Sequence, residues 1–384
     1  MSPLPEGQVV PPGRRPYDAH YMRLALRLGR RNLGNTGPNP AVGCVIVDES
    51  VSPPRIIATG WTERGGRPHA ERVALARAGE AARGATAYVT LEPCAHYGRT
   101  PPCALGLVEA GIARVVTTFD DPDPRVSGRG HAMLREAGIE VVTGVEAESA
   151  RRDMIGFLTR MERKRPYVTL KLAISADGMI SEKPGVATAI TGPMARARSH
   201  LMRAESDAIL VGHTTVIIDD PELTCRLPGL IDQTPVRVVL ASRGLLPEHS
   251  RLVRSASVLP VWVLAAGQPA SAATEAMKEA GVRIIECESK DGRVDLSSAM
   301  VELAQRGIGR VLVEGGAVVA SAFLKADLVD EIALFRSRIT VGPDGVRALA
   351  EGSLDEVLSS PDFVAMADEV FGDDRLTLYI RQRD

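Results

Sequence analysis

The fold of this chain is constrained most by two short segments, PHAE at 68–71 and LEPCAHYGRTPPC at 91–103. Each segment is predicted to lie where a strand or loop leads into a helix, and a helix start offers backbone N–H groups that stabilise a thiolate. Three of their side chains suit a zinc ion that keeps one position free for water: His69, Cys94 and Cys103. Glu71, two residues beyond the histidine, is the expected proton carrier between that water and a leaving amine. The pattern therefore predicts hydrolytic deamination of an amino-substituted, pyrimidine-like ring.

Two simpler interpretations of the same residues remain open. A closed structural zinc site requires a fourth ligand, for which His96 is the nearby candidate, and two ordinary buried cysteines require no metal at all. A zinc-stabilised module without catalysis predicts that Glu71→Gln changes neither fold nor function. The catalytic interpretation predicts that this variant loses turnover and keeps its zinc.

The spacing of the two cysteines is unusual for a zinc deaminase, because residues 95–102 separate them where two residues are typical. This long PC…GRTPPC spacing resembles the bifunctional deaminase-reductases of riboflavin biosynthesis. TGPNPAVGCVIV at 36–47 resembles the first strand of the same family. In the inserted loop, Arg99, His96 and Thr100 could bind a phosphate or sugar of the substrate. The resemblance implies a further substrate contact from Asn39 before the strand, for which the alternative is a turn residue.

Length and charge agree with a two-domain enzyme. A chain of 384 residues with 45% hydrophobic residues can form two cores. The net charge of −2 argues against a nucleic-acid partner, and no apolar run of membrane length is present. Five cysteines without an obvious pairing indicate a reducing cytoplasm. We predict a disordered tail at 1–16, a deaminase domain at 17–163, a reductase domain at 164–384 and a homo-oligomer.

Short apolar runs alternate with helical periods in the first domain, which predicts a mostly parallel, layered α/β sheet. Strands are expected at 42–47, 87–91, 114–118 and 139–142, and helices at 17–31, 70–78, after 103, at 130–137 and at 146–163. Both halves of the zinc motif follow strands, so the site is expected at the carboxyl ends of the strands, with the turn-rich segment DDPDPRVSGRG at 120–130 on its rim.

The second domain is predicted to begin with an alternating strand that runs into an Asp-Gly turn at 167–180. Further strands are expected at 208–212, 236–240, 261–264 and 282–286, and a hairpin turning at 372–374 at the C-terminus. GRVLVEGGAVVASAFL at 309–324 predicts a strand, a Gly-Gly turn and a helix whose start could bind a phosphate, although an ordinary helix cap explains the same glycines.

Residues 167–324 also resemble the reductase half of the same family, through LKLAISADG, HLMRAESDAILVGHTTVIIDDPELTCRLPG and VEGGA. The resemblance implies a cytidine-deaminase-like first domain, a dihydrofolate-reductase-like second domain, and Zn²⁺ and NADPH as cofactors. It implies cofactor contacts at Ala173, Ala189, Thr215, Asp219, Ser242, Gly316 and Ala317. It implies substrate contacts at Ala187, Arg203, Leu223, Arg226 and Glu314. From the residues alone, Arg203 and Arg226 are cations that could hold a phosphate, or ion-paired surface residues.

Three positions depart from the family pattern in the second domain. Ala189 stands where the family usually has Trp, Ala187 where it has Ser, and Met179 where it has Lys or Arg. An aromatic wall, a hydroxyl group and a cation are therefore missing, and each would have contributed packing or a polar anchor.

The resemblance implies two reactions on one pyrimidine ribotide. The first is deamination of 2,5-diamino-6-(5-phosphoribosylamino)pyrimidin-4-one, and the second is reduction of the ribosyl group to ribityl by NADPH. The alternative is a deaminase whose second domain is a degenerate reductase that serves as a nucleotide-binding or regulatory module.

Overall fold

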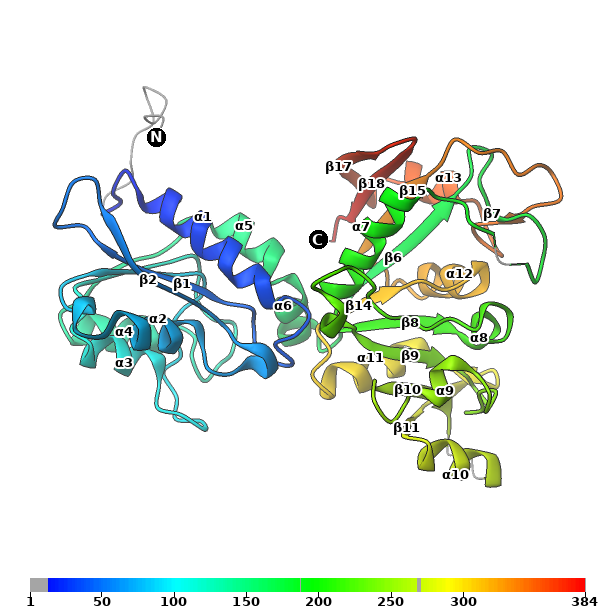
Figure 1. Cartoon of the computed structure of the whole chain (residues 1–384), viewed down its shortest axis with the longest axis horizontal. Helices are drawn as coiled ribbons and strands as arrows, with labels where there is room; N and C mark the ends of the chain where they lie inside the picture. The colour runs from blue at the N-terminus through cyan, green and yellow to red at the C-terminus, as the bar shows by residue number, and fades with distance from the viewer. Residues whose placement is uncertain (1–12, 187, 268–270, 384) are drawn as a thin grey trace. The chain divides into compact units, whose positions relative to one another are not determined.

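The computed structural model describes residues 13–186, 188–267 and 271–383. The chain forms two compact units, unit 1 (Met1–Glu162) and unit 2 (Arg163–Asp384), each with its own sheet (Figure 1). Of the tail predicted at 1–16, residues 1–12 lie outside the described residues, whereas Gly13 and Arg15 contact the rest of unit 1. None of the helices in the described part of the chain has the length and apolar character needed to cross a membrane.

Unit 1 is built on a five-stranded sheet with the order β2-β1-β3-β4-β5. Its elements are α1 (Asp18–Gly29), η1 (Arg30–Asn32), β1 (Gly43–Asp48), β2 (Arg55–Trp61), η2 (Arg64–Gly66), α2 (Ala70–Ala78), η3 (Gly79–Ala82), β3 (Thr86–Val89), α3 (Cys103–Glu109), β4 (Arg114–Thr117), α4 (Arg129–Glu136), β5 (Glu140–Val142), α5 (Ala147–Asp153) and α6 (Ile155–Arg163). The expectation of a mostly parallel sheet was wrong. β1 runs antiparallel to both β2 and β3, because a short connection joins β1 to β2 as a hairpin, and the pairs β3–β4 and β4–β5 are parallel.

Helices cover both faces of this sheet, which gives three layers (Figure 1). Successive residues of β1 point to opposite faces. Val45 packs with Tyr21 and Met22 of α1, and Ile46 packs in the core that contains Ala74 of α2. The helix expected at 146–163 is divided into α5 and α6 near residue 154.

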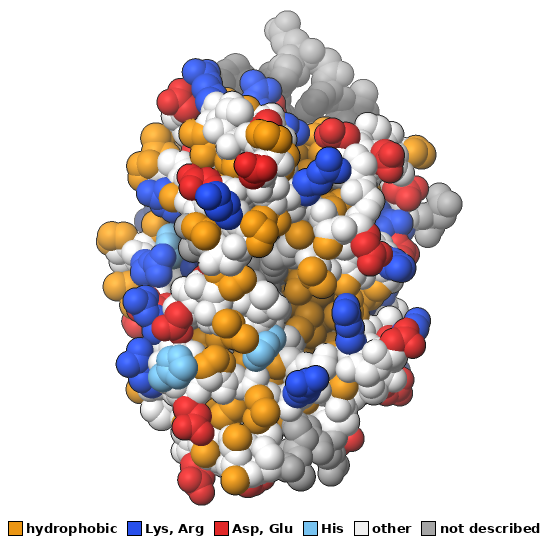
Figure 2. All heavy atoms as spheres, turned by 90° about the vertical axis from the view of Figure 1, so that its right-hand side faces the viewer, with side chains coloured by type: hydrophobic (Ala, Val, Ile, Leu, Met, Phe, Trp, Pro, Cys, Tyr) orange, Lys and Arg blue, Asp and Glu red, His pale blue; other side chains and the backbone are white. Residues whose placement is uncertain are grey.

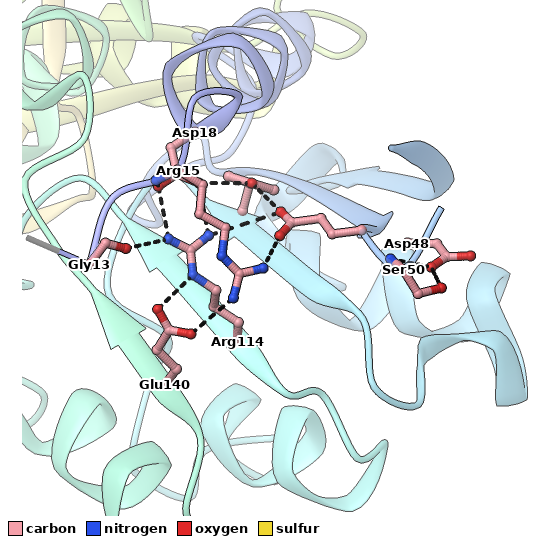
Figure 3. Close-up of polar contacts among 9 residues, drawn as sticks. Gly13, Arg15, Asp18, Asp48, Ser50, Arg114 and Glu140 are labelled. Carbon is pink, nitrogen blue, oxygen red and sulfur yellow. Dashed lines mark hydrogen bonds and ion pairs between the residues drawn. The ribbon is translucent and has the colours of Figure 1, made fainter. Parts of the chain in front are cut away.

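A buried group of charges joins α1 to the sheet (Figure 3). The Arg114 guanidinium donates to both carboxylate oxygens of Asp18 at 2.8 Å and to the Gly13 carbonyl at 2.9 Å. The Tyr88 hydroxyl donates to Asp18 at 2.9 Å, and Arg114 Nε donates to Glu140 at 3.0 Å. Since Arg114 begins β4, this network lies at the amino end of that strand, where it holds the start of α1 against the sheet.

Unit 2 contains a nine-stranded sheet with the order β11-β10-β9-β8-β14-β6-β15-β18-β17. Its elements are β6 (Tyr167–Ile174), β7 (Met179–Ser181), α7 (Pro193–Ala204), β8 (Ala208–Gly212), α8 (His213–Asp219), η4 (Ile231–Gln233), β9 (Val236–Leu240), α9 (Arg251–Arg254), β10 (Val261–Ala266), α10 (Ala272–Glu279), β11 (Val282–Cys287), β12 (Ser289–Lys290), β13 (Arg293–Val294), α11 (Leu296–Gln305), β14 (Arg310–Val313), α12 (Ala317–Lys325), β15 (Glu331–Arg336), β16 (Val346–Arg347), α13 (Leu354–Ser359), β17 (Phe363–Phe371) and β18 (Asp374–Arg381). The strands from β11 to β15 are parallel, and β17 and β18 add an antiparallel hairpin.

The two faces of this sheet have separate cores. Met300 of α11 and Phe323 of α12 pack on one face, and Leu252 of α9 and Met277 of α10 pack on the other. The predicted strands at 208–212 and 236–240 have the bounds of β8 and β9, and the C-terminal hairpin turns between Phe371 and Asp374 as expected. The Asp-Gly turn divides the predicted 167–180 strand into β6 and β7.

Candidate functional site

The zinc motif of unit 1 brings three ligand atoms together. His69 Nδ1 lies 3.8 Å from Cys94 Sγ and 3.4 Å from Cys103 Sγ, and all three ligand atoms lie within 4.8 Å of one another. Ligands around a tetrahedral zinc, with Zn–N and Zn–S bonds of ordinary length, would be roughly 3.6 Å apart. The donor set and its spacing therefore fit a zinc ion. Within the described residues, His96 is not part of this cluster.

The local structure explains how these ligands are positioned, and it corrects one expectation. His69 is the N-cap of α2 and Cys103 is the first residue of α3, but Cys94 lies in a loop and not at a helix start. The Cys94 thiolate is instead stabilised by the start of α3, where the Cys103 N–H donates to Cys94 Sγ at 3.3 Å. The Cys103 thiol, together with His69, lowers the pKa of Cys94 to about 4.

The loop that carries Cys94 is held by a buried carboxylate. Glu92 accepts hydrogen bonds from four backbone N–H groups. Two belong to the loop between β4 and α4, at Asp121 and Gly128, and two to the first turn of α4, at Gly130 and His131. A Cβ atom at Gly130 would lie 2.0 Å from the Pro93 carbonyl oxygen, so the close approach of this loop to the start of α4 requires glycine there. Glu92, Asp120 and His131 also form a second group of possible metal ligands, but Glu92 is already saturated by backbone donors.

Glu71 lies on the first turn of α2 and is 4% exposed. Burial raises the pKa of its carboxyl group, and the neighbouring Cys94 acts in the same direction. A carboxyl group with a raised pKa can accept a proton and return it near neutral pH.

A cavity of about 570 Å³ opens beside the zinc motif and includes His69, Glu71 and Cys94 in its lining. Two predicted substrate contacts, Asn39 and Arg99, also line it. The side-chain NH₂ group of Asn39 donates to the Gly66 carbonyl at 3.0 Å, so the side-chain oxygen of Asn39 takes no part in that hydrogen bond.

Asp121 and Asp123 line the same cavity and were missed by the sequence reasoning. Burial raises the pKa of Asp121 to about 6, whereas Arg125 lowers the pKa of Asp123. The turn-rich segment DDPDPRVSGRG was expected on the rim of the site, and its two lining aspartates were the signal that was not used.

Unit 2 has a larger cavity of about 970 Å³ at the carboxyl ends of β8, β9 and β14, where open α/β sheets bind ligands. Five of the predicted cofactor contacts line it: Thr215, Asp219, Ser242, Gly316 and Ala317. α12 begins at Ala317, so its first backbone N–H groups are available to a phosphate at this cavity. Figure 2 views this side of the molecule, where hydrophobic side chains gather near the centre with basic side chains beside them. The size and the mixed lining fit NADPH.

A buried group of charged side chains includes Glu314, which lies close in sequence to Gly316 of the cavity lining. Arg203 Nε and one terminal nitrogen donate to the two oxygens of Glu314 at 2.8 and 2.9 Å, and the other terminal nitrogen donates to the Thr224 carbonyl at 3.0 Å. Lys171 Nζ lies 3.9 Å from Glu314. Burial alone would raise the pKa of Glu314, but Arg203 and Lys171 lower it to about 2.

The sequence reasoning missed Lys171, although a signal was present. Lys171 is a charged residue in the middle of β6, a strand with neighbours on both sides. A lysine in a central strand is costly to bury unless it is paired or functional.

The remaining predicted contacts of unit 2 that belong to the described residues lie outside the lining of the large cavity. Ala173 is half-buried on β6, Ala189 is exposed, and Leu223 is buried in the core. Arg226 is paired with Glu222 at 3.5 Å on the surface. Ala187 lies outside the described residues.

Comparison with known proteins gives matches along nearly the whole chain. Residues 166–367 match the family model of the RibD C-terminal domain, and residues 16–119 match that of the cytidine and deoxycytidylate deaminase zinc-binding region. The riboflavin biosynthesis protein RibD of Escherichia coli K12 is 39% identical, over 90% of this chain and 94% of that protein. Its counterpart in Haemophilus influenzae is 40% identical, over 93% and 95%.

Solved structures agree with these matches. Acinetobacter baumannii RibD, form 1, has a TM-score of 0.84 and 36% identity, over 95% of this chain and 99% of that one. A diaminohydroxyphosphoribosylaminopyrimidine deaminase/5-amino-6-(5-phosphoribosylamino)uracil reductase from Thermotoga maritima has a TM-score of 0.82 and 34% identity, with the same coverage. Unit 1 thus has the cytidine-deaminase-like fold and unit 2 the dihydrofolate-reductase-like fold. Together, the family model that covers more than half of the chain and relatives matched over nine tenths of it show that this chain belongs to the RibD family of riboflavin biosynthesis proteins.

Proposed function

We propose that this chain carries out two steps of riboflavin biosynthesis, a zinc-dependent deamination in unit 1 and an NADPH-dependent reduction in unit 2. The observation that carries the proposal is the cluster of His69, Cys94 and Cys103 beside the buried Glu71, in a chain that is matched over its two halves by a deaminase and a reductase family. The alternative that unit 2 is a degenerate reductase is not favoured, because residues 166–367 match the RibD C-terminal domain.

In unit 1 the substrate is 2,5-diamino-6-(5-phosphoribosylamino)pyrimidin-4-one, and its 2-amino group leaves as ammonia. His69, Cys94 and Cys103 would hold a zinc ion, which would lower the pKa of a bound water so that it could react at neutral pH. Glu71 removes a proton as the water attacks the ring carbon, and then delivers protons to the ring nitrogen and the leaving amine. Asn39 and Arg99 hold the polar parts of the substrate.

The large cavity of unit 2 would hold NADPH, which would supply the hydride for the conversion of the ribosyl group to ribityl. We assign cofactor contacts to the five residues that line the large cavity, and to Ala173 and Ala189 as the family resemblance implies. We assign the substrate to the group around Arg203 and Glu314, with Leu223, Arg226 and Ala187. Lys171 is added to that group, because its ammonium lies next to Glu314.

We place the two activities at 17–163 and 164–384, in a homo-oligomer in the cytoplasm. Five cysteines that are all free are in keeping with a reducing compartment.

The test is a paired assay on zinc-loaded protein with the diaminopyrimidine ribotide and NADPH, in which ammonia release and NADPH oxidation are followed together. Wild-type protein should give both signals, with NADPH oxidation dependent on prior deamination. Glu71→Gln should abolish ammonia release while zinc content stays unchanged, and Glu80→Gln, the same change at an exposed site of unit 1, should behave as wild type. Ammonia release without NADPH oxidation would refute the assignment of unit 2, and full activity of Glu71→Gln would refute the role of Glu71.

A further inference from the structure

The large cavity of unit 2 contains very little charge. Among the described residues that line it, Arg243 is the single Lys or Arg, and Asp219 is the single acid. In the described part of the chain, the exposed Arg243 guanidinium has no carboxylate within ion-pair distance. The cavity therefore offers an anionic ligand one exposed cation in addition to the start of α12.

Arg243 is carried by a rigid turn at the carboxyl end of β9. The Gly244 N–H donates to the Ala241 carbonyl, which closes a tight turn with Ser242 and Arg243 at its two corners, and Gly244 has a φ of 69°. The Ala241 N–H donates to Leu264 at 3.1 Å, so the turn continues the pairing of β9 with β10.

Ser242 is fixed from the other side of the same turn. Its hydroxyl oxygen accepts a hydrogen bond from the Val294 N–H at 3.2 Å, and its carbonyl accepts one from Ala266 at 3.1 Å. The hydroxyl proton of Ser242 remains available to a ligand. The backbone below Arg243 is thus held in place, while its long side chain can reach into the cavity.

We propose that Arg243 binds the 2′-phosphate of NADPH and makes this reductase select NADPH over NADH, an inference that rests on the NADPH-dependent function proposed above. In Rossmann-type sheets an acid hydrogen-bonds the 2′-hydroxyl of the NADH ribose, whereas a nearby arginine accommodates the 2′-phosphate of NADPH; the same chemistry applies to a side chain at the carboxyl end of β9. The turn after β9 carries a serine and an arginine and no acid. A planar guanidinium can donate two parallel hydrogen bonds to a phosphate, and the Ser242 hydroxyl can add a third.

Binding can test this without any turnover. Isothermal titration calorimetry should be carried out with NADP⁺, NAD⁺ and 2′,5′-ADP on the full-length protein. Arg243→Gln should weaken NADP⁺ and 2′,5′-ADP by about tenfold to a hundredfold, as expected for a charge-assisted contact, and leave NAD⁺ within about twofold. Arg243→Lys should weaken NADP⁺ binding less, because lysine keeps the positive charge but lacks the paired N–H donors of the guanidinium. Arg254→Gln removes the same charge from an exposed position outside the cavity lining, and should match wild type.

The results that would overturn the proposal are distinct from one another. Unchanged NADP⁺ binding in Arg243→Gln would exclude a contact with the 2′-phosphate. An equal loss of affinity for NADP⁺ and NAD⁺ would mean that Arg243 contacts the pyrophosphate or maintains the shape of the cavity. Wild-type protein that binds neither dinucleotide would refute the reductase function itself, and this proposal with it.

Discussion

Replacing Arg114 by Met should destabilise unit 1 far more than the loss of an ordinary ion pair. The Arg114 and Asp18 side chains are each 2% exposed, and Asp18 would keep the Tyr88 hydroxyl and the Arg15 N–H as its remaining donors. Removing one partner of a buried pair leaves an uncompensated charge, which costs about 3–5 kcal/mol. An exposed pair contributes about 0–1 kcal/mol.

The assay can follow unit 1 alone, because the chain has two tryptophans, Trp61 in unit 1 and Trp262 in unit 2. In a Trp262→Phe background, guanidinium unfolding monitored by Trp61 fluorescence gives the free energy of unfolding of unit 1. Arg55→Met is the matched control, since Arg55 pairs with Asp48 at 3.5 Å and is 73% exposed.

The pairing of the two charges can be isolated with a double variant. Arg114→Met combined with Asp18→Asn removes both charges and should cost less than the sum of the two single changes. The reasoning is refuted if Arg114→Met costs as little as Arg55→Met, or if the two changes are additive.

The same network predicts a dependence on pH. Burial alone would raise the pKa of Asp18, but Arg114 and the other donors lower it below its ordinary value. The stabilisation by Asp18 is therefore present above the unfolded pKa of about 3.9 and is lost as the pH falls through the lower folded value. Unfolding of the wild type should become easier below about pH 4, and Arg114→Met should show a smaller change over that range.

Three further outcomes follow from the two sites. Removal of zinc by a chelator should abolish ammonia release and lower the unfolding midpoint of unit 1 while NADP⁺ binding by unit 2 persists; unchanged deamination by protein shown to be metal-free would contradict the zinc assignment. Lys171→Met should lower the kcat/KM of the reductase by about a hundredfold or more, with NADP⁺ binding measured by calorimetry changed little; an equal loss of cofactor binding would place Lys171 in the cofactor site instead. Because the pKa of Glu314 is lowered to about 2, unit 2 should lose roughly 3 kcal/mol between about pH 5 and pH 2, as followed by Trp262 in a Trp61→Phe background; Glu314→Gln should remove that loss, and its persistence would refute the pairing.

The ligand trio was predictable because its signals are local. His69 and Glu71 lie two residues apart at the start of one helix, and the two cysteines bracket one loop. The same reasoning failed for the helix at Cys94, because the N–H that serves its thiolate belongs to α3, which lies beyond the loop. The direction of β1 was missed for a related reason. Alternation of apolar residues predicts a strand and its buried face, and it contains no information about which neighbour the strand pairs with.

Contacts between distant parts of the chain account for the residues that were missed. Lys171 lies in β6 and Glu314 directly follows β14. The two side chains meet because these two strands are neighbours in the sheet. Asp121 and Asp123 reach the deaminase cavity because Glu92, on another loop, holds the segment that contains them. Neither arrangement follows from hydrophobic periodicity, which locates elements but not the partners of their ends.

The structure also changes what Arg203 can do for a substrate. Sequence reasoning allowed a bidentate clamp on a phosphate, but two guanidinium nitrogens already donate to Glu314 and the third to the Thr224 carbonyl. Arg203 therefore retains only single N–H groups for a ligand, and its main role is to fix the Glu314 carboxylate in its ionised form. With Lys171 protonated, the group of two cations and one anion keeps a net charge of +1. A buried excess of positive charge that is already hydrogen-bonded is suited to holding an anionic substrate without large rearrangement, because its donors are oriented before the ligand arrives.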